Sequence, residues 1–302
     1  MKKVNYLPGD GLRAAVEVAR DLEMPLLVTG EPGTGKTQLA YWVAETLLGG
    51  QAQDVLRFNT KTTSVAKDLF YRYDAIRHFR ESRKEDVNVL DYISFEALGK
   101  AILAAGQRQY VVLVDEIDKA PRDFPNDILF EFEEMAFRVE EASARDFEGY
   151  DFGNKPEFRE LKAKIGRVVP QQGVIGLPAG APKPLLILTS NSEKNLPDAF
   201  LRRCVFFHIG FPDKDFLAKI VAANANLSPE YLNMVDAMVR EFEEIRRKGL
   251  RKPPATAELV RWAEILEKRG IDLDQVAKGD KTMQQKLLST YPVLAKNREY
   301  LE

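Results

Sequence analysis

A complete phosphate-binding loop is the feature that most constrains how this chain can fold. Its eight residues are Gly30, Glu31, Pro32, Gly33, Thr34, Gly35, Lys36 and Thr37. The loop follows a short apolar run at residues 25–29 and precedes a helical pattern at residues 38–48. Glycines let successive backbone N–H groups curl around a phosphate, Lys36 can reach the outer phosphates, and the Thr37 hydroxyl can hold Mg²⁺. The motif and its strand–loop–helix context therefore predict a nucleotide-binding α/β domain, and we include the next residue, Gln38, among the binding residues.

Composition narrows the range of partners and compartments. The 302 residues are enough for one large or two modest domains, and the formal net charge is only −2, so no global field recruits nucleic acid or an anionic membrane. The single cysteine, Cys204, excludes an intrachain disulfide and suits a reducing compartment. Residues 1–10 lack the apolar core of a signal peptide, and no apolar run approaches the length of a membrane span. We therefore expect a soluble, cytoplasmic protein that does not bind membranes, and any binding of nucleic acid would have to be local.

Five short apolar runs are typical of strands covered on both faces, which predicts a parallel sheet in a three-layer αβα core. They occupy residues 26–29, 55–59, 110–114, 185–190 and 205–209. From residue 213 onward the pattern is helical, with helices expected at 214–226, 229–248 and 256–269 and Thr256 as the N-cap of the last. The predicted domains are an α/β nucleotide-binding core over residues 1–211, with a glycine-rich insertion at 138–183, and a helical lid over 212–302.

Two acidic residues follow the third apolar run. Residues 111–114 are aliphatic and lead directly into Asp115 and Glu116. Such a pattern is a weak signal alone, but beside a complete phosphate loop it predicts the Walker B strand. We expect Asp115 to hold Mg²⁺ through water and to help bind the nucleotide, while Glu116 polarises a water for attack on the γ-phosphate.

The last two strands add polar groups to the same predicted site. Asn191 ends the fourth run, and in a phosphate-loop fold with an additional central strand it would face the γ-phosphate and orient the water. Arg202 and Arg203 precede the fifth run, and their side chains could project from the protomer surface into a neighbour's nucleotide site. A guanidinium there would neutralise charge in the transition state. A turn-forming Asn and two surface arginines are the plainer alternatives.

These elements, in this order, resemble the AAA+ ATPases over residues 12–266. The finer detail is similar to the MoxR branch, also described as dynein-related AAA ATPases, at residues 59–64, 115–120, 196–203 and 252–259. The resemblance implies an ATPase that uses ATP and Mg²⁺ and works as a ring, usually a hexamer, with ATP bound between subunits and hydrolysis driving chaperone-type remodelling of a partner. It also implies that Arg203 is the first candidate for the arginine finger and Arg202 the second. A partner with a von Willebrand factor A domain is expected by analogy with the branch.

The sequence departs from the wider family in the lid. Many AAA+ proteins have an Arg at the start of the third lid helix, but residues 254–258 contain none. Arg251, Lys252 and Arg261 are candidates to replace it, and solvated surface cations are the equal alternative. A mixture of aromatic and basic residues at 67–84 could touch a substrate in a ring pore, although an amphipathic helix that packs its aromatics is the favoured interpretation.

Two other classes of function compete with a remodelling motor. One is a nucleic-acid-associated motor subunit that uses GTP or ATP; the strand-end text at residues 189–193 and the low net charge disfavour it. The other is a nucleotide-gated scaffold without turnover, which the presence of Glu116, Asn191 and Arg203 disfavours. A preference for GTP with stimulation by DNA would favour the first, and a lack of turnover at micromolar concentration the second.

Overall fold

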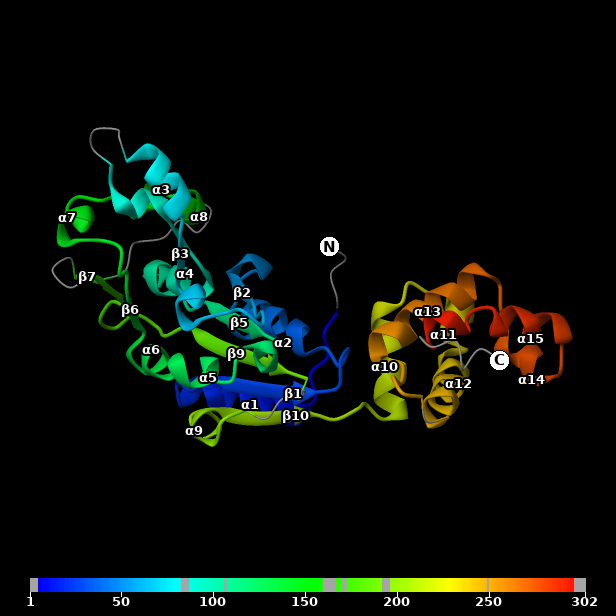
Figure 1. Ribbon diagram of the computed structural model, residues 1–302. Coiled ribbons are helices and arrows are strands. Elements are labelled where there is room, and N and C mark those ends of the chain that lie inside the picture. Colours follow the sequence, from blue (N-terminus) through cyan, green and yellow to red (C-terminus); the bar gives the residue numbers. More distant parts are fainter. Residues whose placement is uncertain are drawn as a thin grey trace. The chain divides into compact units, whose positions relative to one another are not determined.

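The chain forms two compact units in the computed structural model (Figure 1). The model describes residues 5–82, 87–105, 108–159, 167–169, 173–191, 196–248 and 250–295. The first unit comprises Met1–Pro8, Gly30–Gly35 and Ile209–Glu302, and the second comprises Gly9–Thr29 and Lys36–His208. Each unit has its own hydrophobic core.

The second unit is built on a five-stranded sheet with the order β10-β1-β9-β5-β2. The strands are β1 (Leu26–Gly30), β2 (Val55–Asn59), β5 (Val111–Asp115), β9 (Leu185–Ser190) and β10 (Val205–Ile209). The pairs β1/β9, β9/β5 and β5/β2 are parallel. All five strands were predicted from their apolar runs, and β9 lies between β1 and β5 as expected for an additional central strand. The predicted αβα core is therefore confirmed.

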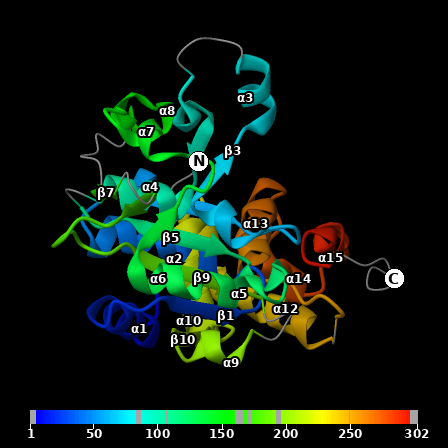
Figure 2. The same ribbon diagram turned by 60° about the vertical axis from the view of Figure 1, so that its left-hand side comes forward.

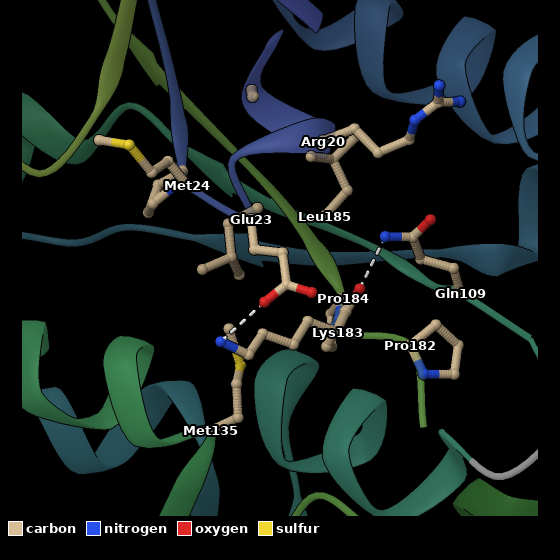
Figure 3. Close-up of a pocket in the computed structure, with 12 residues that line it drawn as sticks. Arg20, Glu23, Met24, Gln109, Met135, Pro182, Lys183, Pro184 and Leu185 are labelled. Carbon is tan, nitrogen blue, oxygen red and sulfur yellow. Dashed lines mark hydrogen bonds and ion pairs between the residues drawn. The ribbon is translucent and has the colours of Figure 1, made fainter. Parts of the chain in front are cut away.

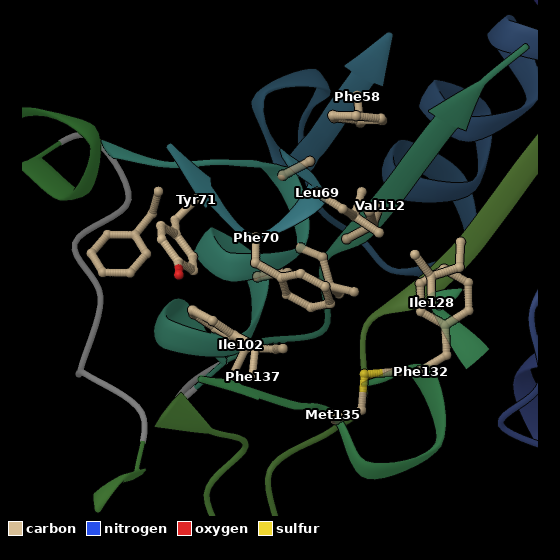
Figure 4. Close-up of a cluster of buried hydrophobic side chains, with 14 of the residues drawn as sticks. Phe58, Leu69, Phe70, Tyr71, Ile102, Val112, Ile128, Phe132, Met135 and Phe137 are labelled. Atoms are coloured by element: carbon tan, nitrogen blue, oxygen red, sulfur yellow. The ribbon is translucent and has the colours of Figure 1, made fainter. Parts of the chain in front are cut away.

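Helices cover both faces of this sheet (Figures 1 and 2). Side chains alternate between the faces, so Leu27, Val112 and Leu186 point into an aromatic-rich cluster that is drawn in Figure 4. Helices that contribute to this cluster include α4 (Ala97–Ala104), α5 (Phe124–Asp127), α6 (Leu129–Glu134) and α9 (Asp198–Leu201). Two further helices lie in this unit, α1 (Asp10–Asp21) and α2 (Lys36–Trp42), and α2 continues as a π-helical turn at Val43–Leu47. The three central strands, β1, β9 and β5, are buried throughout because both of their faces are covered, whereas the edge strands β2 and β10 are partly exposed.

Two small antiparallel additions extend the core. One pairs β3 (Tyr71–Tyr73) with β4 (Ile93–Phe95) and carries α3 (Ala75–Glu81). Residues 67–82 therefore do not form the single amphipathic helix that we predicted, since Tyr71 and Tyr73 lie on a strand and Phe79 is 83% exposed; residues 83 and 84 lie outside the described part.

The predicted insertion at 138–183 forms the second addition. It contains α7 (Ala144–Phe147), α8 (Pro156–Arg159), β7 (Arg167–Val169) and β8 (Val174–Gly176). The two strands form a three-stranded sheet of order β6-β8-β7 with β6 (Ala136–Arg138), which ends where the insertion begins. Phe147, Phe152 and Phe158 belong to the same buried cluster as the main sheet. The described part of the insertion is thus packed onto the core; residues 160–166 and 170–172 lie outside the described part.

The C-terminal part of the first unit is helical, and no strand occurs among its described residues after Ile209. Its helices are α10 (Lys214–Asn224), α11 (Pro229–Leu232), α12 (Val235–Arg247), α13 (Thr256–Lys268), α14 (Leu273–Ala277) and α15 (Lys281–Leu288). The predicted helix at 229–248 is broken between α11 and α12. Thr256 is not the N-cap of α13: Ala255 is, and its N–H donates to the Glu258 carboxylate over 3.0 Å. No helix in the described ranges is both long and apolar enough to cross a bilayer.

We predict that Leu259→Ala destabilises the helical unit by about 2–5 kcal/mol, because it leaves a cavity in a core where Leu259 is fully buried. The two tryptophans lie in different units, so a Trp42→Phe background leaves Trp262 as the fluorescent reporter of this unit during urea unfolding. Leu288→Ala is the matched control, since Leu288 is 59% exposed and its loss should cost less than about 0.5 kcal/mol. Equal effects of the two substitutions would contradict the assignment of this core.

Candidate nucleotide site

The polar residues predicted for the site follow strands whose carboxyl ends meet at one edge of the sheet. In the strand register, Thr29 is paired with Ser190 and Asn59 with Asp115. Asn191 and Glu116 follow directly after β9 and β5. The sheet therefore brings Thr37, Asp115, Glu116 and Asn191 into one hydrogen-bonded group, although they are far apart in sequence.

Asp115 is the centre of this group, and its side chain is only 7% exposed. Its Oδ1 accepts a hydrogen bond from Thr189 Oγ1 over 2.6 Å and one from Thr37 Oγ1 over 3.1 Å. Its Oδ2 lies 2.5 Å from Nη2 of Arg57 on β2. A buried carboxylate needs such compensation, because desolvation penalises its charge. Thr189 and Arg57 were not predicted from the sequence.

Glu116 is held next to Asp115 in an unusual backbone conformation. Its φ of 59° and ψ of 52° lie in the left-handed region, which costs a non-glycine residue about 1 kcal/mol or more. Its N–H donates to Thr189 Oγ1 over 2.9 Å, so one threonine hydroxyl links the two acidic residues. The Glu116 carboxylate accepts from Asn191 Nδ2 over 3.2 Å and pairs with Lys119 Nζ over 2.5 Å. The side chain remains 39% exposed, so water can reach it.

The donor set fits a divalent cation of the hard, oxygen-preferring kind. The Thr37 hydroxyl and the Asp115 carboxylate approach within 3.1 Å, and Mg²⁺ prefers such oxygen ligands together with water and phosphate oxygens. Among the described residues, no group of three or more His, Cys, Asp or Glu could hold a metal alone.

The phosphate loop itself belongs to the first unit from Gly30 to Gly35. Gly33 and Gly35 have φ values of 82° and 89°, which L side chains rarely adopt. A Cβ on Gly33 would lie 2.6 Å from that of Ala255, and one on Gly35 would lie 2.7 Å from the Tyr6 ring. Both glycines are therefore required by conformation and by close packing. Lys36 and Thr37 begin α2, and the Lys36 side chain is buried while Gln38 is half-buried.

A lid cation that the sequence did not single out contacts the loop. Arg246 of α12 is 15% exposed, and its Nη2 lies 3.0 Å from Glu31 Oε2 within the first unit. Its guanidinium also donates to the Pro254 carbonyl and lies 3.5 Å from the centre of the Phe211 ring. Arg251, Lys252 and Arg261, the three candidates from the sequence, are all exposed.

The two arginines after α9 differ in their surroundings. Arg203 Nε donates to Glu133 Oε1 over 2.6 Å, and Nη1 reaches the Ala199 carbonyl over 3.4 Å. Both partners of the ion pair are about half exposed, so the pair contributes little to stability. Arg202 is exposed. The next residue, Cys204, is partly buried, and burial raises the pKa of its thiol to about 12, so it is not a nucleophile near neutral pH.

A pocket shown in Figure 3 lies away from this group, at the amino ends of β1 and β9. Lys183 bridges it, with Nζ 3.0 Å from Glu23 and its carbonyl accepting from Gln109. The strands' carboxyl ends, where the polar group gathers, are at the opposite edge of the sheet. This pocket is therefore separate from the phosphate-loop chemistry.

The fold is that of a phosphate-loop nucleotide-binding domain with an additional strand, β9, between the loop strand β1 and the acidic strand β5. The family model described as AAA domain (dynein-related subfamily) matches residues 25–204, which is more than half of the chain. The chain belongs to this family of AAA+ ATPases.

Solved structures with a similar fold include NtrX from Brucella abortus in complex with ADP, at 14% identity and a TM-score of 0.43. That match covers 89% of this chain and 52% of the NtrX chain, so this chain spans about half its length. Two RuvB variants from Thermotoga maritima match at 16% and 15% identity, with TM-scores of 0.43 and 0.46. Both matches cover 94% of this chain, and they cover 67% and 69% of the respective RuvB chains. Comparison with curated proteins finds no match.

We predict that Thr189→Val destabilises the second unit by about 1–3 kcal/mol, because it leaves the Glu116 N–H without an acceptor and removes a donor from Asp115. Thr189→Ser keeps the hydroxyl and should cost less than about 1 kcal/mol. Urea unfolding followed by Trp42 fluorescence in a Trp262→Phe background measures both. If valine and serine have the same effect, the hydroxyl is not what links the two acids.

Proposed function

We propose that this chain is an ATP-hydrolysing AAA+ motor of the MoxR kind, which forms a homo-oligomeric ring, most simply a hexamer, and remodels a protein partner in the cytoplasm. The observation that carries the proposal is the continuous hydrogen-bonded group from Thr37 through Asp115 and Thr189 to Glu116 and Asn191. It supplies, from one chain, the groups that ATP hydrolysis requires on the side of the attacking water.

Each residue has a distinct proposed role. Lys36 and the loop N–H groups bind the phosphates, and Thr37 with Asp115 would hold Mg²⁺, which when bound neutralises phosphate charge. Glu116 accepts the proton of the attacking water, and its accessible carboxylate is suited to that role. Asn191 donates to Glu116 and so fixes the orientation of the carboxylate. Lys119 compensates the Glu116 charge between turnovers.

The arginine finger is proposed to act on a neighbouring protomer. Arg203 is our first candidate and Arg202 the second. Because the Arg203–Glu133 pair is solvent-exposed, breaking it to reach a neighbour's γ-phosphate costs little. A ring in which each site is completed by the next protomer has the head-to-tail, closed interface that this requires.

The proposed partner is a protein. Near-neutral net charge disfavours nucleic acid, and a protein substrate or a partner with a von Willebrand factor A domain is proposed by analogy with the MoxR branch.

We expect Glu116→Gln to reduce ATP turnover by about 10²- to 10⁴-fold while it retains nucleotide binding, because the amide cannot accept the water's proton. Phosphate release and the fluorescence of a labelled ATP analogue measure the two properties separately. Glu134→Gln, on α6, is the matched control and should turn over like the wild type. Unchanged turnover in Glu116→Gln would remove Glu116 from the role of general base.

A complementation experiment tests whether Arg203 acts in trans. Glu116→Gln protomers have a dead site but an intact finger, and Arg203→Ala protomers have the reverse. Each alone should be nearly inactive, while an equal mixture should recover roughly a quarter of wild-type turnover, since one neighbouring pair in four has both an intact site and an intact finger. If mixing restores nothing although the two variants co-assemble by analytical ultracentrifugation, the finger does not act in trans from Arg203; Arg202→Ala then takes its place in the mixture.

A further inference from the structure

Arg57 lies in the nucleotide site without a role in the chemistry described above. Its Nη2 is 2.5 Å from Oδ2 of Asp115, the carboxylate that would help hold the metal. We propose that Arg57 is a positioning residue that neutralises Asp115 when no metal is bound and is displaced when Mg²⁺ enters with the nucleotide. The inference rests on the proposed function, because it requires a nucleotide–metal complex to bind at this site.

The strand register explains why Arg57 reaches this carboxylate. On β2, Arg57 is paired with Leu113 of β5, and Asp115 is two residues further along β5. Residues two apart point to the same face of a sheet, so Arg57 and Asp115 share a face. The long arginine side chain then extends along the strand to the carboxyl end, where the guanidinium meets Oδ2.

The two partners differ in their freedom to move. The Asp115 side chain is 7% exposed and is fixed by Thr37 and Thr189, whereas the Arg57 side chain is 40% exposed. Arginine can keep its stem on apolar surface while its charged end moves into water. Exchange of cations at Asp115 therefore requires movement of Arg57 alone, and leaves the buried network around Asp115 in place.

Arg57 and a divalent cation would use the same negative charge. The Thr37 hydroxyl, the proposed metal ligand, lies 3.3 Å from the same Oδ2 atom that Arg57 contacts. Two cations beside one carboxylate repel each other, and this repulsion is strong where the surroundings are buried. Arg57 thus raises the Mg²⁺ concentration that the site requires, and it protects Asp115 from being a buried, unpaired charge between rounds of binding.

The test is an Mg²⁺ titration of fluorescently labelled ADP binding, which needs no turnover. Removing the Arg57 charge in Arg57→Gln should lower the half-saturating Mg²⁺ concentration by about three- to tenfold, because the metal no longer displaces a cation. Arg57→Lys keeps the charge and should stay near the wild-type midpoint. Arg72→Gln, which removes a half-exposed arginine paired with Glu96 on a different sheet, is the matched control and should also leave the midpoint unchanged. Circular dichroism verifies folding, and Arg57→Met replaces the Gln variant if that variant does not fold.

The outcomes separate the two proposals. A midpoint that is unchanged or raised in Arg57→Gln overturns the inference, and so does weaker ADP binding at saturating Mg²⁺, since Arg57 would then contact the nucleotide itself. If the wild type binds no labelled nucleotide at any Mg²⁺ concentration, the proposed function fails and the role of Arg57 fails with it.

Discussion

The rest of the site depends on the hydrogen bonds and the ion pair that the buried Asp115 carboxylate makes. It accepts from a helix through Thr37, from the central strand through Thr189 and from the neighbouring strand through Arg57. A carboxylate removed from water is costly unless such donors surround it. Because the carboxylate needs these donors, three separate segments of the second unit meet at Asp115. The position of the Asp115 carboxylate is therefore set by the sheet and not by the conformation of a loop.

Glu116 directly follows Asp115 and is more exposed, and its conformation depends on the same hydrogen-bonded network. The strand ends at Asp115, and the left-handed conformation of Glu116 turns the chain immediately afterwards. The Thr189 hydroxyl accepts a hydrogen bond from the Glu116 N–H and donates one to Asp115. A hydrogen bond within the buried network therefore offsets the cost of the left-handed backbone conformation. Asp115 can then stay buried while Glu116 stays accessible to water. This difference in exposure comes from the backbone geometry, and it suits the different roles that we propose for the two acids.

The sequence identified the elements that depend on local pattern and missed those that depend on register. Apolar runs predicted all five strands of the main sheet, and the three central strands, which are covered on both faces, carry continuous apolar residues. Arg57 and Thr189 were missed because their importance arises from the pairing of β2 and β9 with β5, which no local pattern encodes. The helix expected at 67–84 failed for a related reason: pairing with β4 draws Tyr71 and Tyr73 into a strand. Tertiary pairing can override local periodicity in such short segments.

The first unit imposes its own constraints on loop positions that the phosphate-loop motif leaves variable. Arg246 is largely buried, and the charge of a buried guanidinium requires compensation, which the Glu31 carboxylate and the Pro254 carbonyl provide. Thr34 is fixed locally, since its hydroxyl donates to the Glu31 carbonyl over 2.8 Å. The residue at the second position of the loop therefore compensates a lid charge with its side chain and anchors the loop turn with its backbone. Replacing Glu31 with an uncharged residue would leave the motif intact by pattern but would remove the carboxylate that compensates Arg246, so a match to the motif alone understates what this loop requires.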